Sequence, residues 1–119
     1  MSSTNNYQYT DFTYLNNLVM GDREFKKKII NMFIDKTPAT IKGLQDSYKL
    51  EDWISVKSAA HKFKSSIDFV GSKELSQVIV DLEKNAEKEH KVSIEKGISE
   101  AERLCSLIYG ELKVELSKL

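Results

Sequence analysis

Apolar residues recur every three or four positions through almost the whole chain, and this period constrains the fold more than any other feature of the sequence. Between positions 52 and 71 it gives one stripe: Trp53, Val56, Ala60, Phe63, Ile67 and Val70. Residues with this spacing lie on one face of an amphipathic α-helix. Alternating apolar and polar runs bounded by turn residues, which would indicate strands, are almost absent from the sequence. The pattern therefore predicts an all-α protein.

Capping residues divide this pattern into one short helix and four long ones. We expect helices over about 13–20, 22–48, 52–69, 72–86 and 93–116. Thr13, Asp22, Asp52 and Ser72 are expected to cap the first four, because such side chains accept hydrogen bonds from the first turn of a helix. The apolar period of the second helix, expected to face the core, runs through Phe25, Ile29, Met32, Phe33, Thr37, Ile41, Leu44 and Tyr48. Pro38 falls inside this helix and predicts a kink or a short break, and the unbroken period favours the kink. The sequence thus predicts an antiparallel four-helix bundle with a short additional N-terminal helix.

Length and charge predict one soluble domain. A chain of 119 residues is long enough to bury a single core. We expect the bundle to span residues 10–119, and residues 1–9, rich in Ser, Thr, Asn and Gln, to form a mobile tail. Eighteen basic and eighteen acidic side chains cancel, so the net charge does not favour binding to nucleic acid or to an anionic membrane.

Several other classes of protein receive no support from the sequence. Cys105 is the single cysteine, which excludes an internal disulfide, and a buried position in the last helix is its better interpretation. His61 and His90 are too far apart to show a metal-ligand spacing. No stretch is apolar enough to span a bilayer, and the first residues do not resemble a signal peptide. We expect a monomeric, cytoplasmic protein without a metal or cofactor of its own.

His61 lies outside the apolar stripe of its helix, about 130° from the centre of that stripe in a helical projection. Lys57 precedes it by one turn, and Lys64 and Ser65 follow it by one turn. An exposed imidazole beside two ammonium groups and a small hydroxyl residue could hold a phosphoryl group. From these residues alone, however, a solvated helix face is the more common interpretation.

The sequence around His61 resembles the signature of the histidine phosphotransfer (HPt) domain family. The matching segments are Ala60-His61-Lys62-Phe63-Lys64-Ser65-Ser66, Phe69-Val70-Gly71, Glu74-Leu75 and Leu82-Glu83. The resemblance covers most of the chain, from about residue 11 onwards. It implies that His61 accepts a phosphoryl group from an aspartyl phosphate on a receiver domain and relays it to another receiver. The expected partners are receiver domains of response regulators or of hybrid histidine kinases.

The resemblance also implies roles for neighbouring residues. The attacking atom would be Nε2 of His61, and Glu83 stands where the family has a Gln or Glu that accepts the hydrogen bond of Nδ1–H. Lys64 matches the basic position that offsets charge on the transferring phosphoryl group. Ser65 stands where Gly is frequent in the family, and a small residue there leaves His61 open to a partner. Lys57 is included from its spacing alone, and a role in solubility is an equally good interpretation.

In the family, the short N-terminal helix helps to form the surface that receives the partner. We therefore expect Phe12, Leu15 and Leu18 to contact a partner, with the alternative that this helix only covers the bundle. Asp68 lies on the same helix face as His61 and is included in the expected partner surface, although the sequence assigns it no role.

The sequence contains no motif for making phosphoryl groups. It has no glycine-rich nucleotide loop and no acidic cluster for Mg²⁺, so we expect a relay component that is not itself an enzyme and whose partner receiver supplies the Mg²⁺. Two other interpretations remain open. One is a non-catalytic helical interaction module in which His61 is incidental. The other is the phosphoacceptor domain of a chemotaxis-type kinase, which a kinase domain phosphorylates directly.

Overall fold

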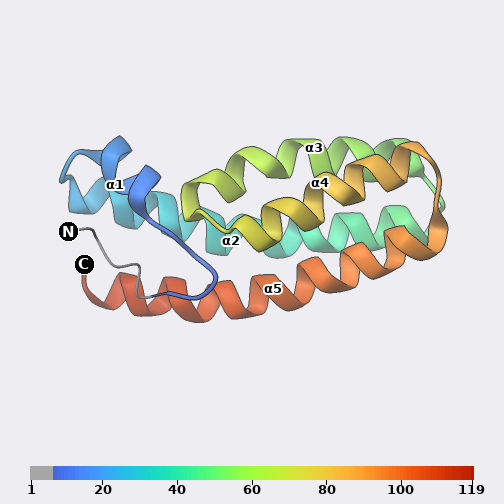
Figure 1. Cartoon of the computed structure of the whole chain (residues 1–119). Helices are drawn as coiled ribbons and strands as arrows, with labels where there is room; N and C mark the ends of the chain where they lie inside the picture. Colours follow the sequence, from blue (N-terminus) through green and yellow to red (C-terminus); the bar gives the residue numbers. More distant parts are fainter. Residues whose placement is uncertain (1–6) are drawn as a thin grey trace.

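Four long antiparallel helices pack side by side, and a short fifth helix lies across one end of them (Figure 1). The computed structural model describes residues 7–119. Its helices are α1 (Thr13–Val19), α2 (Arg23–Lys49), α3 (Trp53–Val70), α4 (Lys73–Glu87) and α5 (Lys91–Ser117). In the bundle α3 lies next to α2 and α4, and so does α5, whereas within the described part of the chain no Cα atom of α3 comes within 8 Å of one of α5. These two helices therefore occupy opposite corners. The predicted fold class is confirmed.

Three of the four predicted N-caps are present. The carboxylates of Asp22 and Asp52 accept hydrogen bonds from the backbone N–H groups of Phe25 and Ser55, and the hydroxyl of Ser72 accepts one from Leu75. Each bond satisfies a donor that has no partner within its own helix.

The predicted cap of the first helix is wrong. Thr13 is the first helical residue, and it is capped by Asp11, whose Oδ1 accepts from Thr13 N at 2.9 Å and from Thr13 Oγ1 at 2.7 Å. A carboxylate two residues before the helix therefore takes the place that the prediction gave to the threonine hydroxyl.

The helix ends follow the expected residues closely. Helix α3 ends at Val70, and Gly71 adopts the left-handed conformation there, with φ of 65°. Helix α2 continues through Pro38 without a break, and α5 extends beyond the expected range at both ends.

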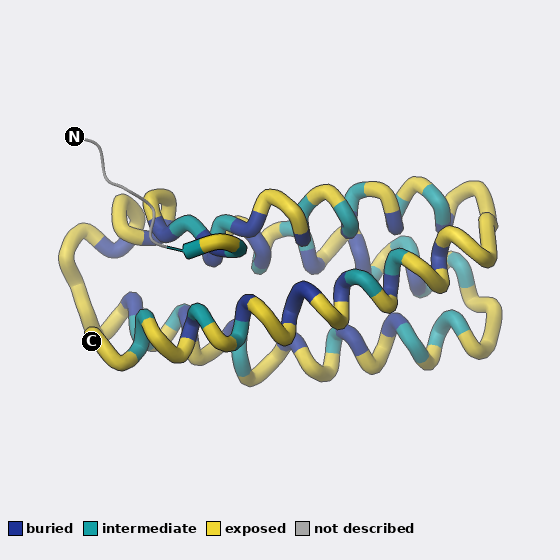
Figure 2. The backbone as a smooth tube through the Cα atoms, turned by 60° about the horizontal axis from the view of Figure 1, so that its bottom comes forward, coloured by how far each residue is buried: buried dark blue, intermediate teal, exposed yellow. Residues whose placement is uncertain are grey.

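The core is formed by the inward faces of all five helices, with the buried residues turned towards the bundle axis (Figure 2). Its largest fully buried side chains are Leu15, Ile30, Leu44, Ile67, Leu75, Ile79, Leu82, Ile94, Ile108, Leu112, Val56 and Val70. The ring of Phe33 stacks on that of Phe63 at 6.2 Å between centroids, which joins α2 to the helix that carries His61. Burial of Cys105 raises the pKa of its thiol to about 12, which leaves it protonated and inert.

The first turns of α2 are rotated relative to the expected apolar stripe. Phe25 and Met32, which continue the apolar period, are 43% and 44% exposed, whereas Ile30 and Lys26 are buried. The ammonium of Lys26 pairs with the carboxylate of Glu115 near the end of α5. A lysine can occupy a buried position only when its charge is paired in this way.

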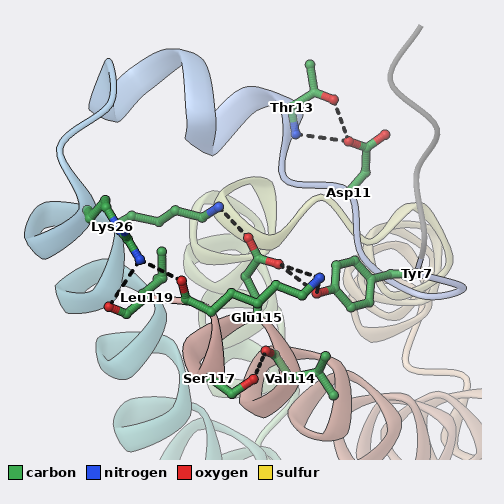
Figure 3. A network of polar contacts seen from close by, with 10 residues as sticks. Tyr7, Asp11, Thr13, Lys26, Val114, Glu115, Ser117 and Leu119 are labelled. Atoms are coloured by element: carbon green, nitrogen blue, oxygen red, sulfur yellow. Dashed lines mark hydrogen bonds and ion pairs between the residues drawn. The ribbon is translucent and has the colours of Figure 1, made fainter.

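Residues 7–12, which we call the N-terminal strap, are bound to the bundle (Figure 3). The hydroxyl of Tyr7 donates to Glu115 at 2.6 Å, and Tyr9 N donates to Glu111 at 3.0 Å. Burial alone would raise the pKa of Glu115, but the hydrogen bonds from Lys26 and Tyr7 hold it below its usual value. Residues 7–9 therefore do not belong to a mobile tail as predicted, because two carboxylates of α5 hold them in place. Residues 1–6 of that predicted tail lie outside the described residues.

Candidate functional site

Helix α3 holds His61 outward. Ala60 and Phe63 on the same helix are buried in the core, and this fixes the rotation of α3 about its axis. His61 consequently points away from the core, and 67% of its side chain is exposed. The position predicted from the helical projection is confirmed.

Glu83 on α4 connects the imidazole with a lysine. Its Oε2 lies 2.9 Å from Nδ1 of His61, and its Oε1 lies 2.8 Å from Nζ of Lys64. The hydrogen bond from Lys64, followed by that from His61, holds the pKa of Glu83 below its ordinary value, so the group is a carboxylate at neutral pH. An anionic oxygen beside Nδ1 favours the tautomer that carries its proton there. The Nε2 lone pair is then free on the exposed side of the ring.

The other two predicted polar neighbours differ in their surroundings. The ammonium of Lys57 lies 3.6 Å from the carboxylate of Glu87, so it pairs with α4 one turn away from Glu83. Ser65 is exposed one turn after His61, and its short side chain leaves the imidazole accessible.

Asp68 is exposed and lines a groove between α1 and the α3–α4 turn. Asp11, Tyr14 and Gln77 also line this groove. Asp68 follows His61 by seven residues, about two turns of α3, so the two residues lie on one face of this helix, as expected from the sequence.

The structure corrects the predicted partner surface on α1. Phe12 and Leu15 are 5% and 0% exposed, so their side chains hold α1 against the bundle and do not reach a partner. Leu18 is 43% exposed, as a partner surface requires.

Leu18 lines an apolar groove of about 370 Å³ between α1, α2 and α3. Phe25, Met32 and Phe69 also line it, and sequence reasoning did not assign them to a partner surface. For Phe25 and Met32 the apolar period was misleading, because it placed both in the core. Their exposure makes the α2 side of this groove part of the accessible surface.

His61 and the apolar groove are connected along α3. His61, Ser65 and Phe69 are spaced four residues apart and therefore form one row on the helix surface. The ring of Phe69 lies 6.1 Å from that of Tyr14 on α1, measured between centroids. We call His61, Ser65 and Phe69 the His61 row.

Residues 7–119 lack two features of other functional classes. None of the helices there combines the length and apolar character needed to cross a membrane. The same residues contain no group of three or more His, Cys, Asp or Glu side chains that could hold a metal ion.

Comparison with known proteins identifies the family. A family model described as "Hpt domain" matches residues 28–118. The chain belongs to the Hpt domain family. Its fold resembles the crystal structure of histidine-containing phosphotransfer protein B from Pseudomonas aeruginosa PAO1, with a TM-score of 0.86 and 18% identity over 93% of this chain and 96% of that chain. No curated protein sequence matches the chain.

Membership of the Hpt domain family supports a role in histidine phosphotransfer within phosphorelays. The matched region includes α3 and α4, which carry His61, Lys64 and Glu83. The N-terminal strap and α1 precede the matched region. The match to the family model therefore does not extend to these two segments, and their arrangement is known from the structure of this chain.

Proposed function

We propose that this Hpt domain accepts a phosphoryl group on Nε2 of His61 from the aspartyl phosphate of one receiver domain and passes it to an aspartate of another. The observation that carries the proposal is the pairing of an exposed imidazole with a carboxylate through its inner nitrogen, Nδ1, which leaves Nε2 available for attack.

In the first transfer, the Nε2 lone pair forms a bond to phosphorus and the bond from phosphorus to the aspartate oxygen breaks. The receiver recovers its carboxylate, and His61 keeps the proton on Nδ1. The carboxylate of Glu83 stabilises the positive charge that develops on the imidazole during this attack. In the second transfer an aspartate oxygen attacks phosphorus, and the neutral imidazole leaves with its Nδ1 proton still bound to Glu83.

Lys64 supplies positive charge for the phosphoryl oxygens. Its ammonium is bound to Glu83 in the unmodified protein, one turn from His61. A phosphoryl group on Nε2 would compete with Glu83 for this ammonium, since both are anionic. We assign the Mg²⁺ of the reaction to the acidic pocket of the receiver.

The receiver docks, in this proposal, on the apolar groove beside the His61 row. A receiver that reaches His61 must also cover Ser65 and the exposed edge of the groove at Phe69, because these residues follow His61 along the same helix. Leu18, Phe25 and Met32 would supply the apolar contacts, in place of the buried Phe12 and Leu15.

The two histidines of the chain give a matched test of the phosphoacceptor. The parent protein, His61→Gln and His90→Gln are incubated with a receiver that carries radioactive phosphoryl groups. We expect the parent and His90→Gln to acquire a label that is stable to alkali and labile to acid, as phosphohistidine is. His61→Gln should remain unlabelled with an unchanged circular dichroism spectrum.

Other outcomes would contradict the proposal in distinguishable ways. Label on His61→Gln would show that another residue is the acceptor. Binding of the receiver without label on any variant would favour a non-catalytic interaction module. Labelling by a kinase domain with ATP, but by no receiver, would favour a phosphoacceptor domain of the chemotaxis type.

A further inference from the structure

Glu111 of α5 binds the N-terminal strap by several donors at once. Its carboxylate accepts hydrogen bonds from Gln8 N at 2.9 Å, from Tyr9 N at 3.0 and 3.1 Å, and from Thr10 Oγ1 at 2.7 Å. Two of these donors are backbone groups of an irregular segment, which has no helical partner for them. Hydrogen bonds to an ionised acceptor are stronger than bonds between neutral groups. Glu111 is therefore the main polar attachment of residues 8–10.

The strap continues from α5 to the end of α3 at the opposite corner of the bundle. Asp11 N donates to the carbonyl oxygen of Val70, the last residue of α3, at 3.0 Å. A Cβ on Gly71 would lie 2.0 Å from the carbonyl oxygen of Asp11, so only glycine allows the strap to pass this closely. The same Asp11 then caps α1 through Thr13.

Helix α1 depends on these attachments for its position. It has seven residues, and so short a helix is unstable in water without tertiary contacts. Phe12 is the last residue of the strap and directly precedes α1. Its ring packs against that of Tyr7 at the beginning of the strap, with 5.5 Å between the centroids. The outer face of α1 carries Tyr14, which lies beside Phe69 of the His61 row, and Leu18, which lines the apolar groove.

We infer that Glu111 is a positioning residue for receiver docking, because it fastens the strap that sets where α1 presents Tyr14 and Leu18. This inference rests on the proposed function, since it concerns how a receiver binds near His61. It assigns a part in docking to a residue of α5, the helix at the opposite corner of the bundle from α3. The geometry of His61, Lys64 and Glu83 is held by bonds between α3 and α4, so Glu111 should act on binding and not on the transfer step.

The test compares Glu111→Ala with Glu102→Ala, which removes an exposed carboxylate from the same helix. Amide hydrogen exchange of Gln8, Tyr9 and Asp11 reports whether the strap is attached, and thermal unfolding reports whether the bundle is intact. Initial rates of transfer from a phosphorylated receiver, measured over a range of receiver concentrations, give kcat and KM. Glu111→Gln is the conservative variant, because its amide oxygen can still accept from the backbone N–H groups.

For Glu111→Ala we expect faster exchange at all three amides. The KM for the receiver should rise roughly tenfold, which corresponds to about 1.4 kcal/mol of binding free energy. The kcat should stay within about twofold of the parent value. Glu102→Ala should match the parent, and Glu111→Gln should recover most of the lost affinity. Faster exchange with an unchanged KM would overturn the inference, as would unchanged exchange in Glu111→Ala. A fall in kcat alone would also overturn it. Failure of the proposed function looks different, because the parent itself would then take up no phosphoryl group.

Discussion

Glu83 divides its two oxygens between Nδ1 of His61 and the ammonium of Lys64. The positive charge of Lys64 is therefore already paired in the unmodified protein. Because this carboxylate serves two donors, its charge matters both to the imidazole tautomer and to the availability of Lys64. The site is a linked set of three groups, and a change to one of them alters the hydrogen bonds of the others.

Lys64→Ala should slow phosphoryl transfer about tenfold to a hundredfold, because a charge that stabilises the transferring oxygens is lost. Its effect on the free energy of unfolding should stay below about 1 kcal/mol, as for other ion pairs near the surface. Rapid-quench transfer kinetics and urea denaturation measure the two effects. Lys62→Ala, at an exposed lysine of the same helix, is the control and should leave both unchanged. Equal rates for the parent and Lys64→Ala would remove Lys64 from the mechanism.

The charge of Glu83 should also appear in the dependence of stability on pH. Its pKa is lowered in the folded protein relative to the ordinary value of 4.5, so the folded state gains stability from the ionised form above that pH. This stability is lost as the pH falls below about 4.5 through the pKa of the folded state. Glu83→Gln should abolish that part of the acid destabilisation, by about 0.5 kcal/mol in view of solvent screening. Urea denaturation of both proteins between pH 3 and pH 6 tests this, and parallel curves would contradict it.

At the scale of elements, the turns between helices contain residues in an unfavourable backbone conformation. Met20, Glu51 and Glu89 have φ values of 50°, 54° and 57°, in the left-handed region that favours glycine. Each follows the end of a helix, and Glu51 pairs with Lys91 across the two turns at one end of the bundle. The connections are thus short and close tightly, at a cost in local strain.

Glu89→Gly should stabilise the protein, because it relieves the left-handed strain at an exposed position. We expect a gain of about 0.5–1 kcal/mol and a rise in Tm of about 4 °C. Gly71→Ala should do the reverse, since an added Cβ meets both a positive φ and the strap. Differential scanning calorimetry compares the two variants with the parent. A lower Tm for Glu89→Gly would mean that its side chain contributes contacts that outweigh the strain.

The elements that follow from local sequence were predicted well. Capping by Asp22, Asp52 and Ser72 depends on residues within one turn, and the exposure of His61 follows from the rotation of its own helix. Such local patterns can be recognised in the sequence without knowledge of contacts elsewhere in the molecule. The contact between His61 and Glu83 was implied by the family resemblance and not by spacing along the chain.

The incorrect predictions for the start of α2, for residues 7–9 and for Phe12 share a physical cause. Lys26 is buried only because Glu115, far away in the sequence, pairs with it, and no apolar period can indicate such a pair. Residues 7–9 were assigned to a mobile tail from their polar composition, yet their donors are bound by Glu111 and Glu115 of α5. Phe12 was assigned to a partner surface, but it is buried beneath these contacts. Each error arises where long-range polar contacts override a local pattern.

At the scale of the whole molecule, Lys26, Glu115 and the strap join three parts of the chain at one end of the bundle. The ammonium of Lys26 also lies 5.3 Å from the centre of the Phe12 ring. This cluster ties the start of α2 to the end of α5 and to the segment before α1. Within the cluster, Lys26 and Glu115 form a nearly buried ion pair. Removal of one member leaves the other charge without a partner, whereas replacement of both by apolar residues leaves no such charge.

Glu115→Ala should therefore destabilise the protein by about 3 kcal/mol, because the ammonium of Lys26 would remain nearly buried without a partner. The double variant Lys26→Met with Glu115→Ala should recover a large part of this loss, since an apolar side chain needs no partner there. Urea denaturation of the parent, both single variants and the double variant completes the cycle. A double variant no more stable than Glu115→Ala would show that the ion pair is not the source of the effect.

The bond between Lys118 and Tyr7, at 3.1 Å, brings the first described residue beside the end of α5. The α4–α5 turn lies at the far end of the bundle from this junction (Figure 1). A circular permutant, with a linker across the junction and new termini between Glu89 and His90, should keep every helix whole. Helix α3 with His61 could then be carried within the loop of a host protein, or report a modification of His61 through a fluorophore attached at the new termini.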